Sequence, residues 1–474
     1  MIQPGPIDAR SFRDPDGVVR IVGDRVLRLV ERAAAERLDT ILARPSVRAA
    51  MAAGKIVGTR RAASTSLPGA LRELNCVVYE HDRIPFVSYA HEWPPAMLAR
   101  AATFTVELAE ELLADGLVLK DATPANVLFN GTQPVLVDIL SIVPRERGEY
   151  LWLAANQFEA TFLLPLIANA QTGLPLSWML QDTYSGLSHR QVARLVGVRR
   201  WLKPSLIRSV ALPAALAKDS GSTAFKTARH SNDEVATFIL QRTLSRLRRQ
   251  VAAVMRPRQG SSFWKRYTVN RAHYAPQDLH DKKAFVAAAL AEIRPQWTLD
   301  IGANTGEFSL LAAQSSNVVA MEVDETSADE IFRQAAAAAA PVQSLVGNFA
   351  RPSPGLGWDN GEMEAFMARV QTRFDLVLML AVVHHLRIAA GIPIAAVLAA
   401  AATVCRSHLI VEHVPPTDAM FRQLARGRDL YGDCERDRFE EELGRRFALV
   451  QRRELSNGRT LYLSKRLTAD GAAA

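Results

Sequence analysis

The chain has 474 residues, of which 49% are hydrophobic and 22% are charged. This composition excludes wholesale disorder, and the length allows roughly two to four globular domains. The 57 Lys and Arg residues exceed the 49 Asp and Glu residues, so that the formal net charge is +8, which raises nucleic acid as a possible partner. The excess is confined to residues 199–271, which carry 16 basic residues against three acidic ones.

Cysteine usage and hydropathy exclude several classes of protein. The three cysteines, Cys76, Cys405 and Cys434, lie far apart and form neither a zinc-binding spacing nor a disulfide framework. No signal-peptide pattern opens the chain, and the longest apolar run, residues 394–405, is shorter than the ~20 residues that cross a membrane. We therefore expect a reduced, cytoplasmic protein without a membrane span.

The first predicted element is a hairpin at residues 16–28. Two runs rich in β-forming residues flank a Gly-Asp turn, Gly23-Asp24, which is typical of a tight connection between antiparallel strands.

A polar pattern follows further along the first half. Asn126 stands five residues after Asp121, and Asp138 follows the run Pro-Val-Leu-Val. This pattern resembles the catalytic loop and metal-binding strand of kinase-like folds, a resemblance that implies a base at Asp121 and metal ligands at Asn126 and Asp138. No glycine follows Asp138-Ile139 and no glycine-rich phosphate loop is visible. The sequence therefore favours a kinase-derived fold without phosphotransfer over an active kinase; the alternative is a strand-turn-strand whose polar residues bond only each other.

Three parts are predicted along the chain: an N-terminal α+β domain at 1–230, kinase-like or accessory, a basic linker helix and linker at 231–261, and a cofactor domain at 262–474. Ser231 and Glu234 fit a capping box at the start of the linker helix. Four arginines crowd its later turns: Arg242, Arg246, Arg248 and Arg249. Because no aromatic residues interleave with them, a solvated face is favoured over a stripe that binds nucleic acid.

After this boundary the pattern alternates between apolar strands and helices. The predicted strands are residues 298–301, 318–323, 374–380 and 408–412, and helices are predicted between them, for example at 308–314 and 393–404. This alternation predicts an α/β domain with a parallel, doubly wound sheet.

A glycine-rich turn follows the first of these strands. The strand contains Asp300, the turn contains Gly302 and Gly306, and the next strand ends near Glu322. Glycine lets the backbone approach a ligand closely, and a carboxylate at the second strand tip can accept both ribose hydroxyls of an adenosine. Asp300 would repel a pyrophosphate but suits an ammonium group, and the spacing is Gly-x-x-x-Gly rather than that of dinucleotide sites.

The turn and the motifs after it resemble class I S-adenosylmethionine-dependent methyltransferases, over about residues 262–465. The resemblance implies a Rossmann-like domain with a seven-stranded, mostly parallel sheet and S-adenosyl-L-methionine as the cofactor. The cofactor-binding residues that it implies are Asp300, Gly302, Asn304, Gly306, Glu322, Asn348 and Phe349. The family usually has Asp where this chain has Asn348, whose amide oxygen can still accept from the adenine amine.

Candidates for catalysis lie at the tips of the fourth and fifth predicted strands. The resemblance places His384 and His385 beside the transferred methyl group, where a neutral imidazole can act as a base. The sequence does not choose between these two histidines. Glu412 ends the next strand and either orients the histidines or contacts the acceptor. The fourth predicted strand lacks the motif Asn/Asp-Pro-Pro-Tyr, which many enzymes that methylate amino groups of DNA or protein carry at this position. Its absence disfavours methylation of nucleic-acid bases or protein amides.

Both halves together resemble a bacterial family of two-part methyltransferases related to a rhizobial nodulation protein. Segments 89–94 and 154–165 match stretches of that family on either side of the Leu-Lys-Asp-Ala segment. Three aromatic residues before the first strand of the cofactor domain either cover the cofactor or pack against the sheet: Trp264, Tyr267 and Tyr274.

We therefore expect a methyltransferase that acts on a small-molecule or glycan-type acceptor by O-methylation. Two alternatives stay open. One is a kinase-like phosphotransferase or pseudokinase with an accessory methyltransferase domain, and the other is an RNA-binding methyltransferase, which the basic segment 199–271 motivates. No metal is expected outside the kinase-like pattern.

Overall fold

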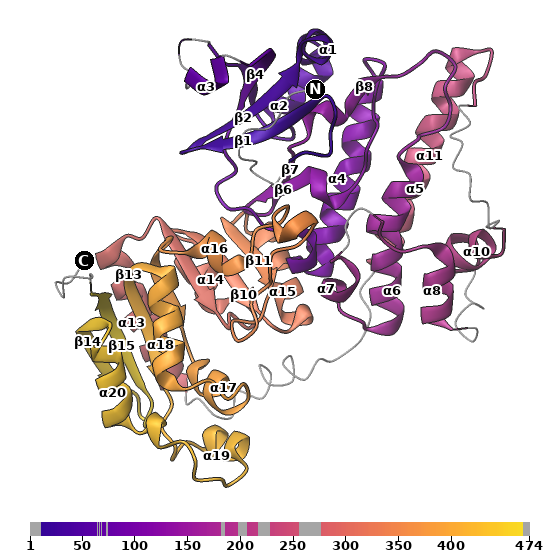
Figure 1. The fold of residues 1–474 in the computed structure, drawn as a ribbon. Coiled ribbons are helices and arrows are strands. Elements are labelled where there is room, and N and C mark those ends of the chain that lie inside the picture. Colours follow the sequence, from indigo (N-terminus) through magenta and orange to yellow (C-terminus); the bar gives the residue numbers. More distant parts are fainter. Residues whose placement is uncertain are drawn as a thin grey trace. The chain divides into compact units, whose positions relative to one another are not determined.

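The computed structural model describes residues 11–63, 65, 67, 69–72, 74–181, 185–197, 206–216, 228–255 and 276–467 (Figure 1). Contacts divide the chain into two compact units. The first unit consists of Met1–Arg258 with Gly355–Met363, and the second consists of Gln259–Pro354 with Glu364–Ala474. The predicted linker at 256–261 and the three aromatic residues Trp264, Tyr267 and Tyr274 lie outside the described residues.

The first unit begins with a four-stranded antiparallel sheet in the order β1-β2-β4-β3. The predicted hairpin is confirmed: β1 and β2 pair through Val22 and Arg25, and Gly23 adopts a positive φ of 60° in the turn. The strands and the helices beside them are β1 (Gly17–Val22), β2 (Arg25–Glu31), α1 (Arg32–Leu42), α2 (Pro45–Ala52), β3 (Thr59–Arg61), α3 (Gly69–Arg72) and β4 (Cys76–His81).

The rest of the first unit combines two small antiparallel pairs with helices. β5 (Leu117–Leu119) pairs with β8 (Ile142–Pro144), and β6 (Val127–Asn130) pairs with β7 (Gln133–Leu136). The helices are α4 (Pro95–Leu113), α5 (Ala155–Phe158), a π-helical turn (Glu159–Leu163), α6 (Leu164–Thr172), α7 (Leu176–Met179), α8 (His189–Val196), α10 (Leu212–Leu216) and α11 (Asp233–Val254).

Helix α11 differs from the predicted linker helix in its cap and its packing. Its N-cap is Asn232 rather than Ser231, and the Asn232 side chain accepts hydrogen bonds from the backbone of Glu234 and Val235. Its buried side chains, among them Leu240 and Leu244, face α4, so the helix is part of the first unit.

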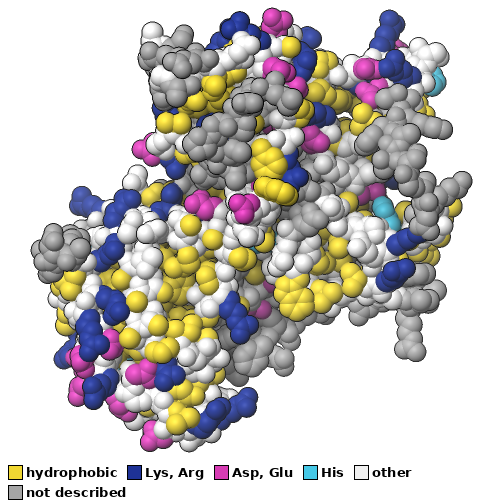
Figure 2. Space-filling view, viewed as in Figure 1, with side chains coloured by type: hydrophobic (Ala, Val, Ile, Leu, Met, Phe, Trp, Pro, Cys, Tyr) yellow, Lys and Arg dark blue, Asp and Glu magenta, His cyan; other side chains and the backbone are white. Residues whose placement is uncertain are grey.

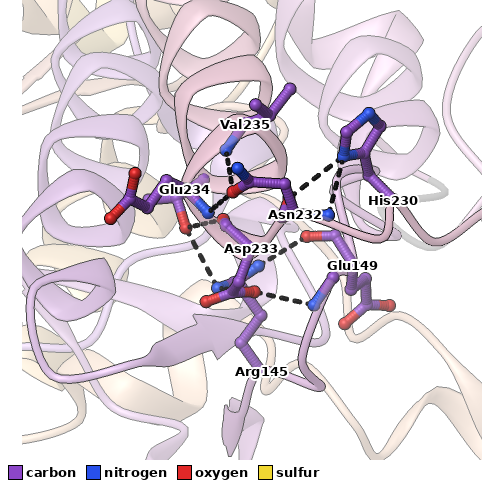
Figure 3. A network of polar contacts seen from close by, with 9 residues as sticks. Arg145, Glu149, His230, Asn232, Asp233, Glu234 and Val235 are labelled. Atoms are coloured by element: carbon purple, nitrogen blue, oxygen red, sulfur yellow. Dashed lines mark hydrogen bonds and ion pairs between the residues drawn. The ribbon is translucent and has the colours of Figure 1, made fainter.

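A polar network fixes the start of α11 (Figure 3). The Asp233 carboxylate accepts from Arg145 Nη2 at 2.7 Å and from the backbone N–H of Gly148 at 2.7 Å. Arg145 Nη1 also donates to the carbonyl of Glu149. These bonds attach the helix start to the loop after β8.

The second unit contains a seven-stranded sheet in the order β11-β10-β9-β12-β13-β15-β14. Every pairing among the first five strands of this order is parallel, and β15 pairs antiparallel with both β13 and β14. The predicted seven-stranded, mostly parallel α/β fold is therefore confirmed for this unit. Its strands are β9 (Trp297–Ile301), β10 (Asn317–Glu322), β11 (Val342–Val346), β12 (Phe374–Met379), β13 (Cys405–His413), β14 (Phe447–Glu454) and β15 (Thr460–Arg466).

Helices connect these strands and bury the apolar side chains between them. α15 packs against β10 and β11, whereas α18, an alanine-rich apolar run, packs against β12 and β13. The helices are α13 (Pro276–Ile293), α14 (Glu307–Ala312), α15 (Glu325–Ala337), α16 (Phe366–Val370), α17 (Val383–Ile388), α18 (Ile394–Val404), α19 (Ala419–Ala425) and α20 (Arg436–Gly444).

Charged side chains lie on the outer surface of the second unit around α20 and β14. Arg445 pairs with Glu441 and Glu442 along the helix, and Figure 2 shows both signs of charge interspersed in this region. Among the helices of the described residues, none has the length and apolar character needed to cross a membrane.

Candidate active site

The glycine-rich turn links β9 to α14 at the carboxyl end of the sheet. Gly302 has a φ of 75°, and a Cβ atom at this position would lie 2.9 Å from the Val382 side chain in the loop after β12. Backbone N–H groups of Gly302 and Ala303 donate to the carbonyl of Met321 on β10. Glycine therefore lets the turn lie close to both neighbouring strands.

Asp300 is a buried acid in β9, directly before the turn. Its carboxylate accepts a hydrogen bond of 2.6 Å from Ser309 Oγ on α14. Burial raises the pKa of Asp300 to about 6, although the Ser309 bond and the charge of Lys282 oppose this effect. A cationic ligand beside Asp300 would favour its ionised form.

Glu322 ends β10 with both carboxylate oxygens held in place. Oε2 accepts from the backbone N–H of Asn304 at 2.7 Å, and Oε1 accepts from that of Asp324 at 2.9 Å. Asn304 adopts a positive φ of 51°, a conformation that asparagine tolerates. Burial raises the pKa of Glu322. Each oxygen can accept a further bond from a ligand hydroxyl.

Asn348 and Phe349 follow β11. The Asn348 side-chain oxygen accepts from the backbone N–H of Ala350 at 2.9 Å, which closes a local turn. This oxygen, which the resemblance assigns to the adenine amine, is therefore already engaged in one hydrogen bond.

These strand ends surround one cavity of about 450 Å³. It lies where the chain crosses from β11 on one side of β9 to β12 on the other, which is where doubly wound sheets bind ligands. The predicted cofactor residues that line it are Asp300, Gly302, Asn304, Glu322, Asn348 and Phe349. Gly306 does not line it: this residue is the N-cap of α14, and a Cβ there would meet Ile331.

The two adjacent histidines of α17 differ in their position relative to the cavity. His385 lines it, whereas His384 is buried and does not. Their ring centroids lie 4.2 Å apart. Burial lowers the pKa of His385 to about 4, with a smaller contribution from the charge of Arg459. Burial, together with neighbouring positive charges, also lowers the pKa of His384 well below its usual value. Both imidazoles are therefore neutral near pH 7.

Glu412 is wholly buried behind the cavity and does not line it. Its carboxylate lies 2.5 Å from Lys282 Nζ and 3.3 Å from Arg459 Nη1. Arg459 also contacts Asp418 at 2.9 Å. Glu412 does not line the cavity, which disfavours contact with an acceptor, and these ion pairs are with Lys282 and Arg459 rather than with the two histidines.

Sequence reasoning did not single out Lys282 and Arg459. Lys282 lines the cavity from α13, and Arg459 stands at the start of β15 with 1% of its side chain exposed. Neither residue belongs to a local motif, and no sequence signal would have found them.

The predicted kinase-like residues lie in the first unit. Asp121 follows β5, Asn126 precedes the β6–β7 pair, and Asp138 follows it. Arg28 Nη1 lies 3.1 Å from Asp138 Oδ1, and the Arg28 side chain is 7% exposed. Burial raises the pKa of Asp121. Among the described residues, no cluster of three or more His, Cys, Asp or Glu is arranged to hold a metal ion.

Comparison with known proteins identifies a relative along nearly the whole chain. The chain is 30% identical over 472 residues to the nodulation protein NoeA of Rhizobium meliloti (strain 1021). The match covers 98% of this chain and 97% of NoeA. No family model matches the chain.

Solved structures are similar to a smaller part. The PH0226 protein of Pyrococcus horikoshii OT3 has a TM-score of 0.33 and 13% identity, over 43% of this chain and 100% of that chain. The magnesium protoporphyrin IX methyltransferase (ChlM) of Synechocystis PCC 6803, solved with bound SAM, has a TM-score of 0.30 and 15% identity, over 44% of this chain and 86% of that chain.

The likeness to NoeA confirms the predicted relation to a rhizobial nodulation protein, and the sheet of the second unit has the predicted class I architecture. The chain belongs to the family of the nodulation protein NoeA, and its second unit has the fold of class I S-adenosylmethionine-dependent methyltransferases.

Proposed function

We propose that this chain transfers the methyl group of S-adenosylmethionine to an oxygen atom of a small-molecule or glycan-type acceptor. One observation carries the proposal: a single cavity is lined by Asp300, Glu322 and His385, which are two acids suited to the cofactor and one neutral imidazole. When bound, the cofactor supplies a methyl group on a sulfonium sulfur, which an acceptor can attack in line.

The residues fit this cofactor at two separated points. Glu322 is fixed by two backbone N–H groups and can accept from the ribose hydroxyls. Asp300 lies at the end of the neighbouring strand and can receive the ammonium group, whose positive charge would offset the effect of burial on this acid. Because β9 and β10 are adjacent and parallel, both acids face the same edge of the sheet.

His385 is compatible with an oxygen acceptor, because a hydroxyl loses a proton during methylation and a neutral imidazole can take it. Held by Asp300 and Glu322, the cofactor would supply the methyl group to the acceptor oxygen, and its sulfur would leave as a thioether with the bonding electron pair. A ring nitrogen of His385 takes the hydroxyl proton. The His384 ring packs against the His385 ring, with the ring centroids 4.2 Å apart. Glu412 pairs with Lys282 and Arg459 and holds these two cations in place.

Phosphoryl transfer by the first unit has less support. The kinase resemblance assigns a metal ion to Asp138, but this carboxylate is paired with the Arg28 guanidinium. Arg28 is held in turn by bonds to His81 and to the Val137 carbonyl. A cation of the protein itself therefore already pairs with one oxygen of the carboxylate to which the resemblance assigns a metal.

Calorimetry with S-adenosylmethionine tests the cofactor site. We expect the wild-type chain to bind one equivalent and Glu322→Ala to bind about tenfold or more weakly, since hydrogen bonds from ribose to a charged acceptor are lost. Glu330→Ala on α15, which removes an acid away from the cavity, serves as the matched control and should bind as the wild type does.

The transfer itself is tested with isotope-labelled S-adenosylmethionine and cell lysate, followed by profiling of labelled metabolites. We expect label in an O-methyl group of a small molecule or glycan, and loss of that product with Glu322→Ala. A folded wild-type chain that does not bind the cofactor would refute the proposal, and label on nitrogen or carbon would refute the oxygen acceptor.

A further inference from the structure

A basic segment follows β13 in the second unit and includes α19. In residues 419–430, three arginines accompany a single acid, Asp429. The three are Arg422, Arg426 and Arg428, and we call them the arginine surface because all of them are exposed. Figure 2 shows Lys and Arg side chains gathered at the end of the second unit where α19 lies in Figure 1.

The arginine surface differs from other surface arginines of this unit in its lack of acid partners. Arg436 on α20 lies 2.6 Å from Glu454, and Arg445 lies 2.8 Å from Glu441. Among the described residues, no carboxylate forms an ion pair with a member of the arginine surface. Its positive charge therefore faces solvent and attracts anions.

The backbone gathers these three side chains at one end of α19. Arg426 is the C-cap of the helix and has a φ of 52°, in the left-handed region. Glycine or asparagine usually takes such a position, because a Cβ atom is crowded there. The turn brings the chain back towards the helix, and the backbone N–H of Arg428 donates to the carbonyl of Ala425 at 3.1 Å. An arginine is thus held where the backbone favours a smaller residue.

Helix α17 joins this loop to the candidate cofactor cavity. It packs against α19, and its Arg387 side chain lies 2.7 Å from Asp433 and donates to the carbonyl of Leu430. The same helix lines the cavity with His385 and Leu386. The loop that carries the arginine surface is therefore fixed to the helix that presents the candidate base.

We propose that the arginine surface binds an anionic group, a phosphate or a carboxylate, of the methyl acceptor. This inference rests on the proposed function, since it adds a charge class to the same acceptor, whose hydroxyl group lies beside His385. A guanidinium group donates paired, charge-assisted hydrogen bonds to either anion. The acceptor is thus a small molecule or glycan with a negative charge at a distance from the methylated oxygen.

RNA fits this surface less well than a small anion does. Binding of a single strand uses exposed aromatic rings on which bases stack. The aromatic residues of this segment, Phe421 and Tyr431, are buried and pack edge to face against each other at 5.9 Å. The exposed groups are therefore guanidinium groups without a stacking platform among them.

Isotope-labelled S-adenosylmethionine, lysate metabolites and anion-exchange chromatography test this assignment. We expect the labelled product to be retained as an anion. Treatment with phosphodiesterase and phosphatase distinguishes a phosphate, whose charge is lost from the labelled part, from a carboxylate, whose charge stays. The triple variant Arg422→Ala/Arg426→Ala/Arg428→Ala should lower product formation at limiting acceptor about tenfold or more. Its affinity for S-adenosylhomocysteine in calorimetry should equal that of the wild type.

Two further variants separate charge from fold. The triple variant Arg422→Lys/Arg426→Lys/Arg428→Lys keeps the charges and should retain most of the product formation. Arg294→Ala is the matched control, because Arg294 is also an exposed arginine after a helix, with a φ of 49°, but it precedes β9, at the strand end opposite the cavity. It should form product as the wild type does. All these variants change surface residues and should keep the unfolding temperature of the wild type.

An uncharged labelled product, or equal product formation by the wild type and the triple alanine variant, would overturn the role of the arginine surface. Binding of a single-stranded RNA oligomer that this variant loses while product formation is unchanged would assign the surface to RNA instead. A wild-type chain that fails to bind S-adenosylhomocysteine, or that labels no acceptor, would overturn the proposed function, so the two failures are distinguishable.

Discussion

At the scale of single residues, burial assigns different tasks to groups that look alike in the sequence. His384 and His385 are adjacent, and only His385 lines the cavity. Two acids, Asp300 and Glu412, lie near the carboxyl ends of β9 and β13, and only Asp300 lines it. The sequence places all four residues at strand tips, but which side of a loop faces a cavity depends on packing from elsewhere in the fold.

The pKa values of Asp300 and His385 predict a split between kcat and kcat/KM as the pH falls. Burial raises the pKa of Asp300 to about 6, so the free protein loses this negative charge below that pH and binds the cofactor more weakly. Burial lowers the pKa of His385 to about 4, so the base stays neutral and active until the pH falls towards that value. We expect kcat/KM for the cofactor to fall below about pH 6 while kcat at saturating cofactor stays constant to about pH 5.

Single substitutions test which residue causes each pH-dependent fall in these two kinetic constants. Asp300→Asn should remove the limb of kcat/KM near pH 6, and His385→Ala should lower kcat by about 10²–10⁴, the usual contribution of a general base. His408→Ala changes a histidine that is bonded to Ser407 and lies away from the cavity, and should leave both limbs in place. A fall of the wild-type kcat with a midpoint near 6.5 would contradict the lowered pKa of His385, and an unchanged kcat in His385→Ala would contradict its role as the base.

At the scale of elements, buried ion pairs join segments that are distant along the chain. Lys282 on α13 contacts Glu412 on β13, and Arg459 at the start of β15 contacts both Glu412 and Asp418 before α19. These contacts link α13 to β13 and to the start of the antiparallel strand β15.

Arg459→Met should destabilise the second unit by about 3–5 kcal/mol, because it leaves the buried Glu412 and the partly buried Asp418 with one cation fewer. Denaturation in urea, followed by circular dichroism, measures this loss. The control is Arg438→Met on α20, whose side chain is 72% exposed and whose loss should cost less than about 0.5 kcal/mol. A loss below about 1 kcal/mol for Arg459→Met would show that these carboxylates find other partners.

The same elements show how far the sequence predicts this fold. Strands β9, β10, β12 and β13 and the glycine turn were predictable, because short apolar runs and glycine spacing are local signals, whereas β11, β14 and β15 were not among the predicted strands. The arrangement of α13, β13 and β15 in space depends on contacts between residues that are distant along the chain. The positions of Lys282 and Arg459 beside Glu412 could therefore not be predicted from the sequence. The cap of α11 also differed by one residue, since Asn232 competes with Ser231 for the same backbone groups.

At the scale of the whole molecule, the position of the positive charge matters more than its total of +8. Arginines of the basic segment on α11 approach acids of the first unit: Arg246 lies 3.8 Å from Glu159, and Arg248 lies 3.7 Å from Glu110. This pairing favours a role within the first unit over a stripe for nucleic acid, because these arginines already face carboxylates.

The two units also predict how the whole chain responds to ligands. S-adenosylhomocysteine at about 100 times its Kd should stabilise the folded chain by about 2.7 kcal/mol and raise its unfolding temperature, because it binds the folded state alone. ATP with Mg²⁺ should leave that temperature unchanged, since Arg28 neutralises Asp138 in the first unit. Differential scanning calorimetry measures both shifts, with Glu322→Ala as the control that loses the first. A Mg²⁺-dependent rise with ATP would show that Arg28 gives way to a metal, and would restore the kinase-like alternative for the first unit.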